Sequence, residues 1–291
     1  MATHEVSTPD GRTLAVLEVG SQDGPAIVAH HGSPGAGMLF RTEVESAEQR
    51  GLRLLAYDRP GFGSSSRHEG RRVADAAADV AAILDALGVE RFATYGTSGG
   101  GPHALACAAL LPGRCVAAAT IAGVGAANAP DLDWLDGMGE GNQAEFAAAF
   151  EGREQVTAFL REDAVELTAA KPDQLAEAMR PHLSAVDARA LTGELAEFLL
   201  GSIQAGLATG VDGWVDDDLA FVSPWGFDIG SIAVPALVWQ GEEDLMVPGA
   251  HGRWLRDHVP GAEGGVLPGE GHLTLFVHRV TDVHAWLAER L

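Results

Sequence analysis

Short apolar runs alternate with segments of helical periodicity along the first part of the chain. An opening β-hairpin is expected around the turn Pro9-Asp10-Gly11. Residues 71–87 place their apolar side chains on one helical stripe, as a helix packed on a sheet does. Buried strands are expected near residues 26–31, 53–57, 91–95 and 116–122. This alternation predicts an α/β fold with a mainly parallel central sheet and helices on both faces.

The alternation stops between residues 125 and 231, where Ala- and Glu-rich segments predict helices only. These helices are expected over residues 142–150, 154–170, 173–179 and 187–207. The later part of the chain returns to strands, near 234–240 and 265–267, and ends in a helix over 275–291. We therefore predict one core domain formed by residues 1–124 and 232–291, interrupted by a helical lid of residues 125–231.

A glycine-rich turn joins one predicted strand to the helix that follows it. The pentapeptide Gly96-Thr97-Ser98-Gly99-Gly100 lies between the apolar strand 91–95 and an Ala/Leu-rich helix over 102–111. A serine oxygen can attack only if it stands clear of its own backbone, and so sharp a turn requires glycine two residues to either side. Ser98 is therefore the candidate nucleophile. Because the chain contains 37 glycines, this motif needs support from the rest of the site.

The strand 26–31 runs into a second Gly/Pro loop, Gly32-Ser33-Pro34-Gly35. In open α/β sheets, ligands bind at the carboxyl ends of the strands, where this loop begins. Acyl transfer needs two backbone N–H donors aimed at the developing oxyanion. We expect Gly99, the residue after the nucleophile, to supply one donor and Ser33 the other, since Pro34 has no N–H.

Two residues late in the chain can complete a nucleophilic site. Asp244 follows the strand 234–240, and His272 lies in a predicted glycine-flanked loop before the terminal helix. A serine hydroxyl needs an imidazole to take its proton and a carboxylate to hold the tautomer of that imidazole. The chain order Ser98, Asp244, His272 is the one expected for this arrangement.

Other residues remain alternatives for both roles. Glu242 and Glu243 lie close enough to Asp244 in the sequence to replace it. His278 and His284 also follow Asp244, but both fall in the predicted terminal helix instead of a loop. This placement favours His272 as the general base.

These segments together resemble a known superfamily. The motifs that carry the resemblance are His31-Gly32-Ser33-Pro34-Gly35, Tyr57-Asp58-Arg59-Pro60-Gly61-Phe62-Gly63-Ser64-Ser65, Gly96-Thr97-Ser98-Gly99-Gly100, Gly241-Glu242-Glu243-Asp244 and Gly271-His272. Over almost the whole chain, the sequence resembles α/β-hydrolase-fold enzymes of the proline-iminopeptidase-like and small-ester-hydrolase branch. The resemblance implies Ser98 as nucleophile, His272 as base, Asp244 as the orienting carboxylate, and Ser33 and Gly99 as oxyanion donors.

Aromatic residues in the predicted lid are candidates for an apolar substrate pocket. Most apolar residues at helical spacing pack inside a helical layer, so only a few are expected to face a substrate. We name four candidates: Phe146, Phe150, Trp214 and Trp225. Glutamates are also plentiful in this segment, but acids on helices usually form solvated faces.

The serine at the position of the nucleophile argues against two other enzyme activities of the fold that this chain resembles. Haloalkane dehalogenases and epoxide hydrolases of the fold it resembles use an aspartate at the position of Ser98, and epoxide hydrolases also need lid tyrosines. The only tyrosines here, Tyr57 and Tyr95, lie outside the predicted lid. We therefore expect a serine hydrolase of small, mostly neutral carboxylic esters or related acyl compounds.

Three alternatives stay open. A proline iminopeptidase-like aminopeptidase would need a lid acid to pair with the free amine of its substrate. The chain also departs from that family at Ser33, Thr97 and Gly99, where the family has glycine, glycine and tryptophan. A cofactor-free peroxidase-like member of the fold and a catalytically silent small-ligand binder are the other two.

Composition narrows the class of partner. The net charge of −22 argues against nucleic acid or an anionic membrane, because both are polyanions. Residues 1–5 have neither the basic nor the apolar region of a signal peptide, and we expect a cytoplasmic protein acting on a small-molecule substrate. Cys107 and Cys115 are expected to be small buried residues without a disulfide, and no zinc spacing occurs, so no metal or cofactor is expected.

Overall fold

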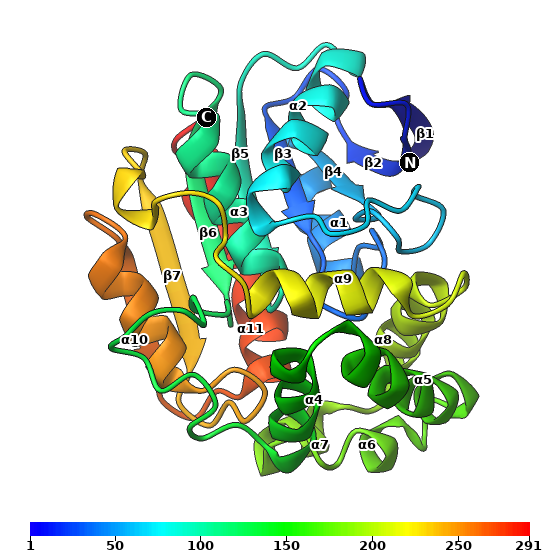
Figure 1. Cartoon of the computed structure of the whole chain (residues 1–291). Helices are drawn as coiled ribbons and strands as arrows, with labels where there is room; N and C mark the ends of the chain where they lie inside the picture. Colours follow the sequence, from blue (N-terminus) through cyan, green and yellow to red (C-terminus); the bar gives the residue numbers. More distant parts are fainter.

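Eight strands form a single twisted sheet in a computed structural model that describes residues 1–291 (Figure 1). The strands are β1 (Ala2–Ser7), β2 (Thr13–Gly20), β3 (Ala26–His30), β4 (Arg53–Tyr57), β5 (Phe92–Thr97), β6 (Cys115–Ile121), β7 (Ala236–Gly241) and β8 (Glu263–Leu267). Their order across the sheet is β1-β2-β4-β3-β5-β6-β7-β8. Only the β1/β2 and β2/β4 pairs are antiparallel. The predicted mainly parallel sheet and the opening hairpin are confirmed.

Helices cover both faces of the sheet, as the alternating pattern predicted. On one face, α1 (Arg41–Arg50) and α11 (His272–Ala288) pack against the strands. On the other face lie α2 (Ala76–Ala86), which the short 3₁₀ turn η1 (Val73–Asp75) introduces, α3 (Gly100–Leu110) and α10 (Gly249–His258). All five residues of β3 are buried, because a central parallel strand is covered on both sides. The edge strand β1 instead alternates between more and less exposed residues.

The chain between β6 and β7 contains six further α-helices and forms what we call the helical insertion, residues 125–231. They are α4 (Glu140–Glu151), α5 (Arg153–Ala169), α6 (Leu175–Ala178), α7 (Ala185–Ala190), α8 (Gly193–Gly206) and α9 (Asp212–Phe221), followed by the 3₁₀ turn η2 (Ile229–Ser231). Helices α4 to α8 lie together on one side of the molecule, and α9 runs between them and the sheet (Figure 1).

Two features of the helical insertion differ from the sequence prediction. The single helix expected over 187–207 is divided into α7 and α8, because Leu191 and Thr192 leave the helical conformation. Helix α9 was not predicted at all. It contains Gly213 and three consecutive aspartates, which are poor helix formers, so propensity gave no signal there.

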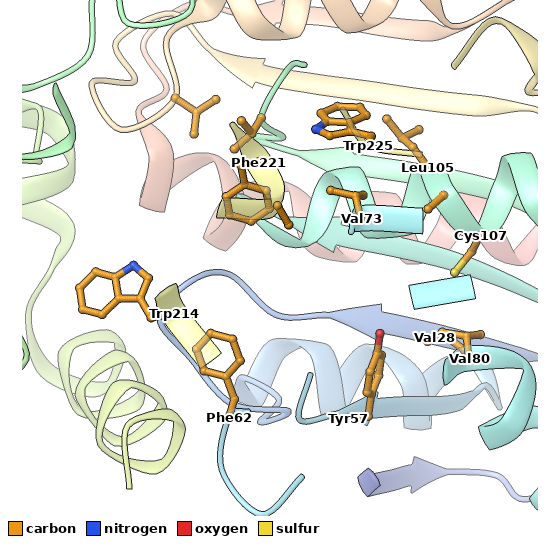
Figure 2. Close-up of a cluster of buried hydrophobic side chains, with 14 of the residues drawn as sticks. Val28, Tyr57, Phe62, Val73, Val80, Leu105, Cys107, Trp214, Phe221 and Trp225 are labelled. Atoms are coloured by element: carbon orange, nitrogen blue, oxygen red, sulfur yellow. The ribbon is translucent and has the colours of Figure 1, made fainter. Parts of the chain in front are cut away.

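Helix α9 joins the helical insertion to the core. Its Phe221 is 1% exposed and lies over the core side chains, and Trp214 lies at the other end of the helix (Figure 2). Trp225, after the helix, belongs to the same buried hydrophobic cluster as Leu105 of α3 (Figure 2). Cys107 and Cys115 are both free and buried, as predicted. None of the helices combines the length and the apolar content needed to cross a bilayer.

Candidate active site

Ser98 lies on the sharp turn between β5 and α3. Its φ of 55° is in the left-handed region, which non-glycine residues seldom adopt and which strained functional turns often contain. The flanking glycines are required by space: a Cβ on Gly96 would lie 2.0 Å from the carbonyl oxygen of Gly100, and a Cβ on Gly100 would lie 2.2 Å from that of His30. The turn thus has the geometry of a nucleophile elbow.

His272 and Asp244 form a buried pair at the same edge of the sheet. The imidazole Nδ1 of His272 lies 2.7 Å from Asp244 Oδ2, and the two side chains are 5% and 0% exposed. Asp244 follows β7, and the backbone amides of Met246 and Val247 donate to its Oδ1, each at 2.8 Å. The carboxylate is thereby fixed toward the imidazole, which fixes the histidine tautomer in turn.

The structure corrects the predicted setting of His272. This residue does not lie in a loop but is the first residue of α11, and Gly271 is the N-cap. The terminal helix therefore begins three residues earlier than the predicted 275. Helix starts are difficult to locate when the cap residue is a glycine that offers no side chain to the first amides.

Burial and the ion pair act in opposite directions on the two pKa values. Burial by itself lowers the pKa of His272, but the attraction and hydrogen bond of Asp244, with a further contribution from Asp187, raise it above its ordinary value. Burial raises the pKa of Asp244, and the interaction with His272 opposes this rise. An imidazole with a raised pKa is a stronger base for a serine proton.

Ser98 and His272 both line one cavity, together with Ser33 and Gly99. No hydrogen bond joins Ser98 Oγ to His272 Nε2 in this structure, and such contacts commonly tighten only when substrate binds. The amides of Ser33 and Gly99 donate to no other backbone group. Two free N–H groups beside a nucleophile are what an oxyanion hole requires.

A buried ionic network holds the loop that carries Ser33. Arg59 Nη2 lies 2.9 Å from Ser33 Oγ and 2.6 Å from Asp217 Oδ2, and Ser33 Oγ also donates to Asp217. Arg71 pairs with the other oxygen of Asp217 at 2.6 Å. Burial alone would raise the pKa of Asp217, but Arg59 and Arg71 lower it, so this carboxylate stays ionised. Arg59 is therefore engaged within the protein and is not free to clamp a substrate carboxylate.

The cavity has a volume of about 180 Å³, and more than half of its lining residues are hydrophobic. Phe146 and Trp214 line it, as the sequence prediction proposed for them. The other two aromatic candidates do not. Phe150 is 50% exposed, and Trp225 is buried against the core, where it stacks on Phe227. Phe150 lies one turn after Phe146, at the C-terminal end of α4, so helical spacing puts both on the same side and could not show that only Phe146 is covered.

Two carboxyl groups of the helical insertion meet in the cavity lining. Glu145 and Asp218 are 6% and 1% exposed, and Trp214 Nε1 donates to Glu145 at 2.8 Å. Burial raises the pKa of Glu145 to about 7, and burial together with Glu145 raises that of Asp218 well above its ordinary value. The expectation that the lid glutamates form solvated faces is therefore wrong for Glu145. Burial thus favours the protonated form of both carboxyl groups.

The rival acids and bases lie elsewhere. His278 is 57% exposed and pairs with the largely buried Glu270, outside the cavity. His284 is buried against Tyr95 and makes no hydrogen bond, and burial lowers its pKa to about 4. Glu242 and Glu243 are exposed. No cluster of three or more histidine, cysteine or acidic side chains is arranged to hold a metal ion.

The sequence reasoning missed the buried aspartates of the helical insertion. Asp216, Asp217 and Asp218 are all at most 1% exposed, although they are consecutive on one helix. Buried acids are rare unless they are paired. Three adjacent acids between Trp214-Val215 and the apolar run Leu219-Ala220-Phe221 were the available signal, since a solvated charge run seldom has apolar neighbours on both sides.

Comparisons with known proteins find relatives that match part of the chain. A bifunctional esterase/perhydrolase of Acinetobacter calcoaceticus is 32% identical over 117 residues, which are 40% of this chain and 42% of that protein. Epoxide hydrolase B of Mycobacterium tuberculosis is 33% identical over 97 residues, 32% of this chain and 27% of that one. The matched region thus spans less than half of the length of these relatives.

Similarity of fold extends over nearly the whole molecule. The crystal structure of a bromoperoxidase from Bacillus anthracis superposes with a TM-score of 0.73 at 20% identity, covering 98% of each chain. The sequence profile of the alpha/beta hydrolase fold family matches residues 25–279. With this match over most of its length, the chain belongs to the alpha/beta hydrolase fold family.

Proposed function

We propose that this protein is a serine hydrolase that cleaves small, mostly neutral carboxylic esters or related acyl compounds through an acyl-enzyme. The observation that carries the proposal is the 2.7 Å contact between His272 and Asp244 at the cavity that Ser98 lines. A buried imidazole held by a carboxylate at a cavity with a strained serine has the parts required for nucleophilic acyl transfer.

The reaction follows from the roles of these groups. His272 Nε2 takes the proton of Ser98 Oγ as the oxygen attacks the acyl carbon, and Asp244 stabilises the imidazolium that forms. The amides of Ser33 and Gly99 stabilise the oxyanion of the tetrahedral intermediate. The imidazolium then gives its proton to the leaving alcohol, which leaves the acyl group on Ser98. Water, deprotonated by His272, attacks this ester and releases the acid.

Cavity size and polarity support a small substrate with a neutral acyl group. An apolar cavity of roughly 150 Å³ holds a molecule the size of benzene, so the volume of about 180 Å³ fits a short acyl chain or a small ring. The apolar lining, which includes Phe146, Trp214 and Phe221, favours such a group over a charged one. The acidic protein surface also disfavours the approach of anions.

The two relatives described above differ in activity, from epoxide hydrolysis to esterase and perhydrolase activity. Ser98 supports an ester-type intermediate. Tyr57 and Tyr95, the only tyrosines, belong to β4 and β5 and not to the helical insertion, which argues against the epoxide-opening alternative. A cofactor-free peroxidase-like activity stays a further alternative.

One observation favours a second candidate, an aminopeptidase related to the proline iminopeptidases. The Glu145–Asp218 pair is a buried carboxyl pair in the lining of the cavity, and such a pair can bind the protonated amine of an aminoacyl substrate. This candidate predicts a preference for aminoacyl amides over neutral esters.

A direct experiment compares the candidates on purified protein. We expect a fluorophosphonate probe to label Ser98 and acyl p-nitrophenyl esters of short chain length to be hydrolysed. Absence of both labelling and hydrolysis would favour a silent binder. Faster turnover of a prolyl amide than of a butyryl ester, by about tenfold or more in kcat/KM, would favour the aminopeptidase. Halide- and peroxide-dependent oxidation measures the peroxidase-like alternative.

A further inference from the structure

Asp187, on helix α7 of the helical insertion, caps the start of a helix that belongs to the core. Its side chain is 0% exposed. Oδ2 accepts a hydrogen bond from the amide of His272 at 2.8 Å, and Oδ1 accepts from those of Leu273 and Thr274 at 2.9 and 3.1 Å. The first amides of a helix have no partner within the helix, and an anion there also interacts favourably with the helix dipole.

The capping comes from outside the helix because the local residue cannot provide it. The N-cap of α11 is Gly271, which has no side-chain acceptor. A Cβ at this position would lie 2.3 Å from Asp187 Oδ2, so the glycine also leaves the room that the carboxylate occupies. Ser184, the N-cap of α7, donates from its Oγ to Asp187 Oδ2 at 2.8 Å and fixes the carboxylate from the other side.

The first residue of the capped helix is the candidate base itself. Two carboxylates therefore hold His272, Asp187 at the backbone amide and Asp244 at the imidazole Nδ1. We propose that Asp187 is a positioning residue for the hydrolysis reaction, and that it holds the backbone of His272 so that the imidazole reaches both Asp244 and Ser98. This inference rests on the proposed function, and it makes the helical insertion part of the catalytic apparatus.

Electrostatics support the same role. The two charged groups that act on the imidazole are Asp244, from the loop after β7, and Asp187, from α7, and both oppose the effect of burial on the pKa of His272. Helix α7 packs against α11, so the carboxylate cannot withdraw without separating these helices. A small displacement of the base is costly, because a shift of about 1 Å in a reacting group lowers rates by roughly a hundredfold.

The test uses Asp187→Asn in the full chain, with kinetics on a p-nitrophenyl ester and NMR titration of His272. Asparagine keeps the volume but replaces one acceptor oxygen by a donor that faces the helix amides. We expect kcat to fall by roughly tenfold to a hundredfold with KM within about threefold, and the pKa of His272 to move to lower pH. A folded variant with wild-type kcat and an unchanged titration would overturn the proposal.

Asp216→Asn is the matched control, because Asp216 is also a buried aspartate of the insertion but pairs with Arg67 and Arg153 away from the cavity. It is expected to leave the titration of His272 unchanged, and an equal shift in both variants would contradict a specific role for Asp187. If Asp187→Asn does not fold, Ser184→Ala gives a milder test, with a smaller fall in kcat in the same direction expected and wild-type kcat as the contrary result.

Different outcomes contradict the hydrolase assignment and the positioning role of Asp187. If the wild-type protein neither hydrolyses acyl esters nor reacts with a fluorophosphonate, the hydrolase assignment is wrong whatever the titration shows. If the wild type reacts but Asp187→Asn reacts at the same rate with the same titration, only the positioning role is wrong.

Discussion

Asp217 Oδ2 lies 2.6 Å from Arg59 Nη2, and the two side chains are 0% and 1% exposed. This ion pair joins helix α9 of the helical insertion to the loop after β3, because Arg59 also donates to the carbonyl oxygen of His31 and to Ser33 Oγ. A buried pair of this kind contributes little net stability compared with apolar residues, but removing one partner is costly. If the Ser33 amide is an oxyanion donor, as proposed, this ion pair orients it through the Ser33 side chain and the His31 carbonyl.

Ser33→Ala tests this orientation without removing a charge. Alanine keeps the backbone N–H but loses the hydroxyl contacts with Arg59 and Asp217. We expect kcat to fall by roughly tenfold, less than the 10²-fold to 10³-fold typical of losing an oxyanion donor, with KM nearly unchanged. Steady-state kinetics of a short acyl ester provide the measurement, and an unchanged kcat would indicate that the loop is held without this hydroxyl.

Asp217→Asn is expected to act mainly on stability. It leaves Arg59 and Arg71 without their shared carboxylate in a buried setting. Loss of one partner of a buried pair costs about 3–5 kcal/mol of unfolding free energy, which urea denaturation can measure. A loss below about 1 kcal/mol would mean that water or a neighbouring group replaces the carboxylate.

Ser98→Ala should separate catalysis from folding. Ser98 makes no hydrogen bond through its hydroxyl, and alanine occupies less space at the elbow, so the melting temperature should change little. Hydrolysis should fall by several orders of magnitude, because no other hydroxyl can form the acyl-enzyme at this position. Retained turnover in pure variant protein would exclude Ser98 as the nucleophile.

The pH dependence of activity should report the state of His272. The imidazole must be neutral to accept the serine proton, and its pKa is raised above the ordinary value of 6.5. Activity should therefore be lost as the pH falls through this raised pKa, so the midpoint of the acid limb should lie above 6.5. The profile of kcat/KM on a neutral ester is the measurement, and a midpoint well below the ordinary value would contradict the assignment.

Asp244→Asn should lower kcat strongly, by up to about 10⁴-fold, since an asparagine favours the wrong tautomer of the histidine. The replacement keeps the shape of the side chain, so circular dichroism should remain that of the wild type. Glu243→Gln is a suitable control because that side chain is exposed and outside the cavity. Equal losses of kcat in the two variants would indicate that Asp244 acts only by adding one negative charge to the protein.

The core of the fold could be predicted because each strand and its helix have a local pattern. The fully apolar run of β3 and the helical stripe of α2 are visible in the chain, and the positions of Ser98, Asp244 and His272 follow from where strands end. An unbroken apolar run indicates a central strand because such a strand is buried on both faces.

The contacts between the insertion and the core could not be predicted in this way. Asp187 and Asp217 contact residues 85 and 158 positions away in the chain, so no local pattern identifies their partners. Glu145 and Phe150 lie on the same helix, yet one is 6% and the other 50% exposed. Which face of such a helix turns inward depends on tertiary packing that helix propensity does not encode.

The Glu145–Asp218 pair leads to a prediction about stability. Burial raises the pKa of Glu145 to about 7, and that of Asp218 is also well above its ordinary value, so the folded protein retains protons that the unfolded chain releases. Stability linked to this pair should therefore be present at low pH and be lost as the pH rises from the unfolded pKa of about 4 through the folded value near 7.

Asp218→Asn removes one titrating carboxyl and gives Glu145 an amide donor. We expect the difference in melting temperature, variant minus wild type, to be more positive at about pH 8 than at about pH 5. Using the difference between the two proteins cancels the titration of groups that they share. Asp216→Asn is the control, because it removes a carboxylate paired with Arg67 and should destabilise the protein at both pH values. A constant difference between Asp218→Asn and wild type across this range would show that folding does not raise the pKa values of this pair.

The same carboxyl pair decides between the two candidate substrates. If it binds a protonated amine, Glu145→Gln should lower kcat/KM for a prolyl amide by about tenfold or more while changing that for a butyryl ester by less than about threefold, since a charge-assisted hydrogen bond contributes roughly 1.5–3 kcal/mol. If the pair serves only as a neutral wall of the cavity, both substrates should respond alike. Glu197→Gln, at an exposed position of α8, controls for the general loss of charge. A selective loss on the amide, in an enzyme that also prefers the amide, would replace the esterase proposal with an aminopeptidase, because the carboxyl pair would then be the site that sets specificity.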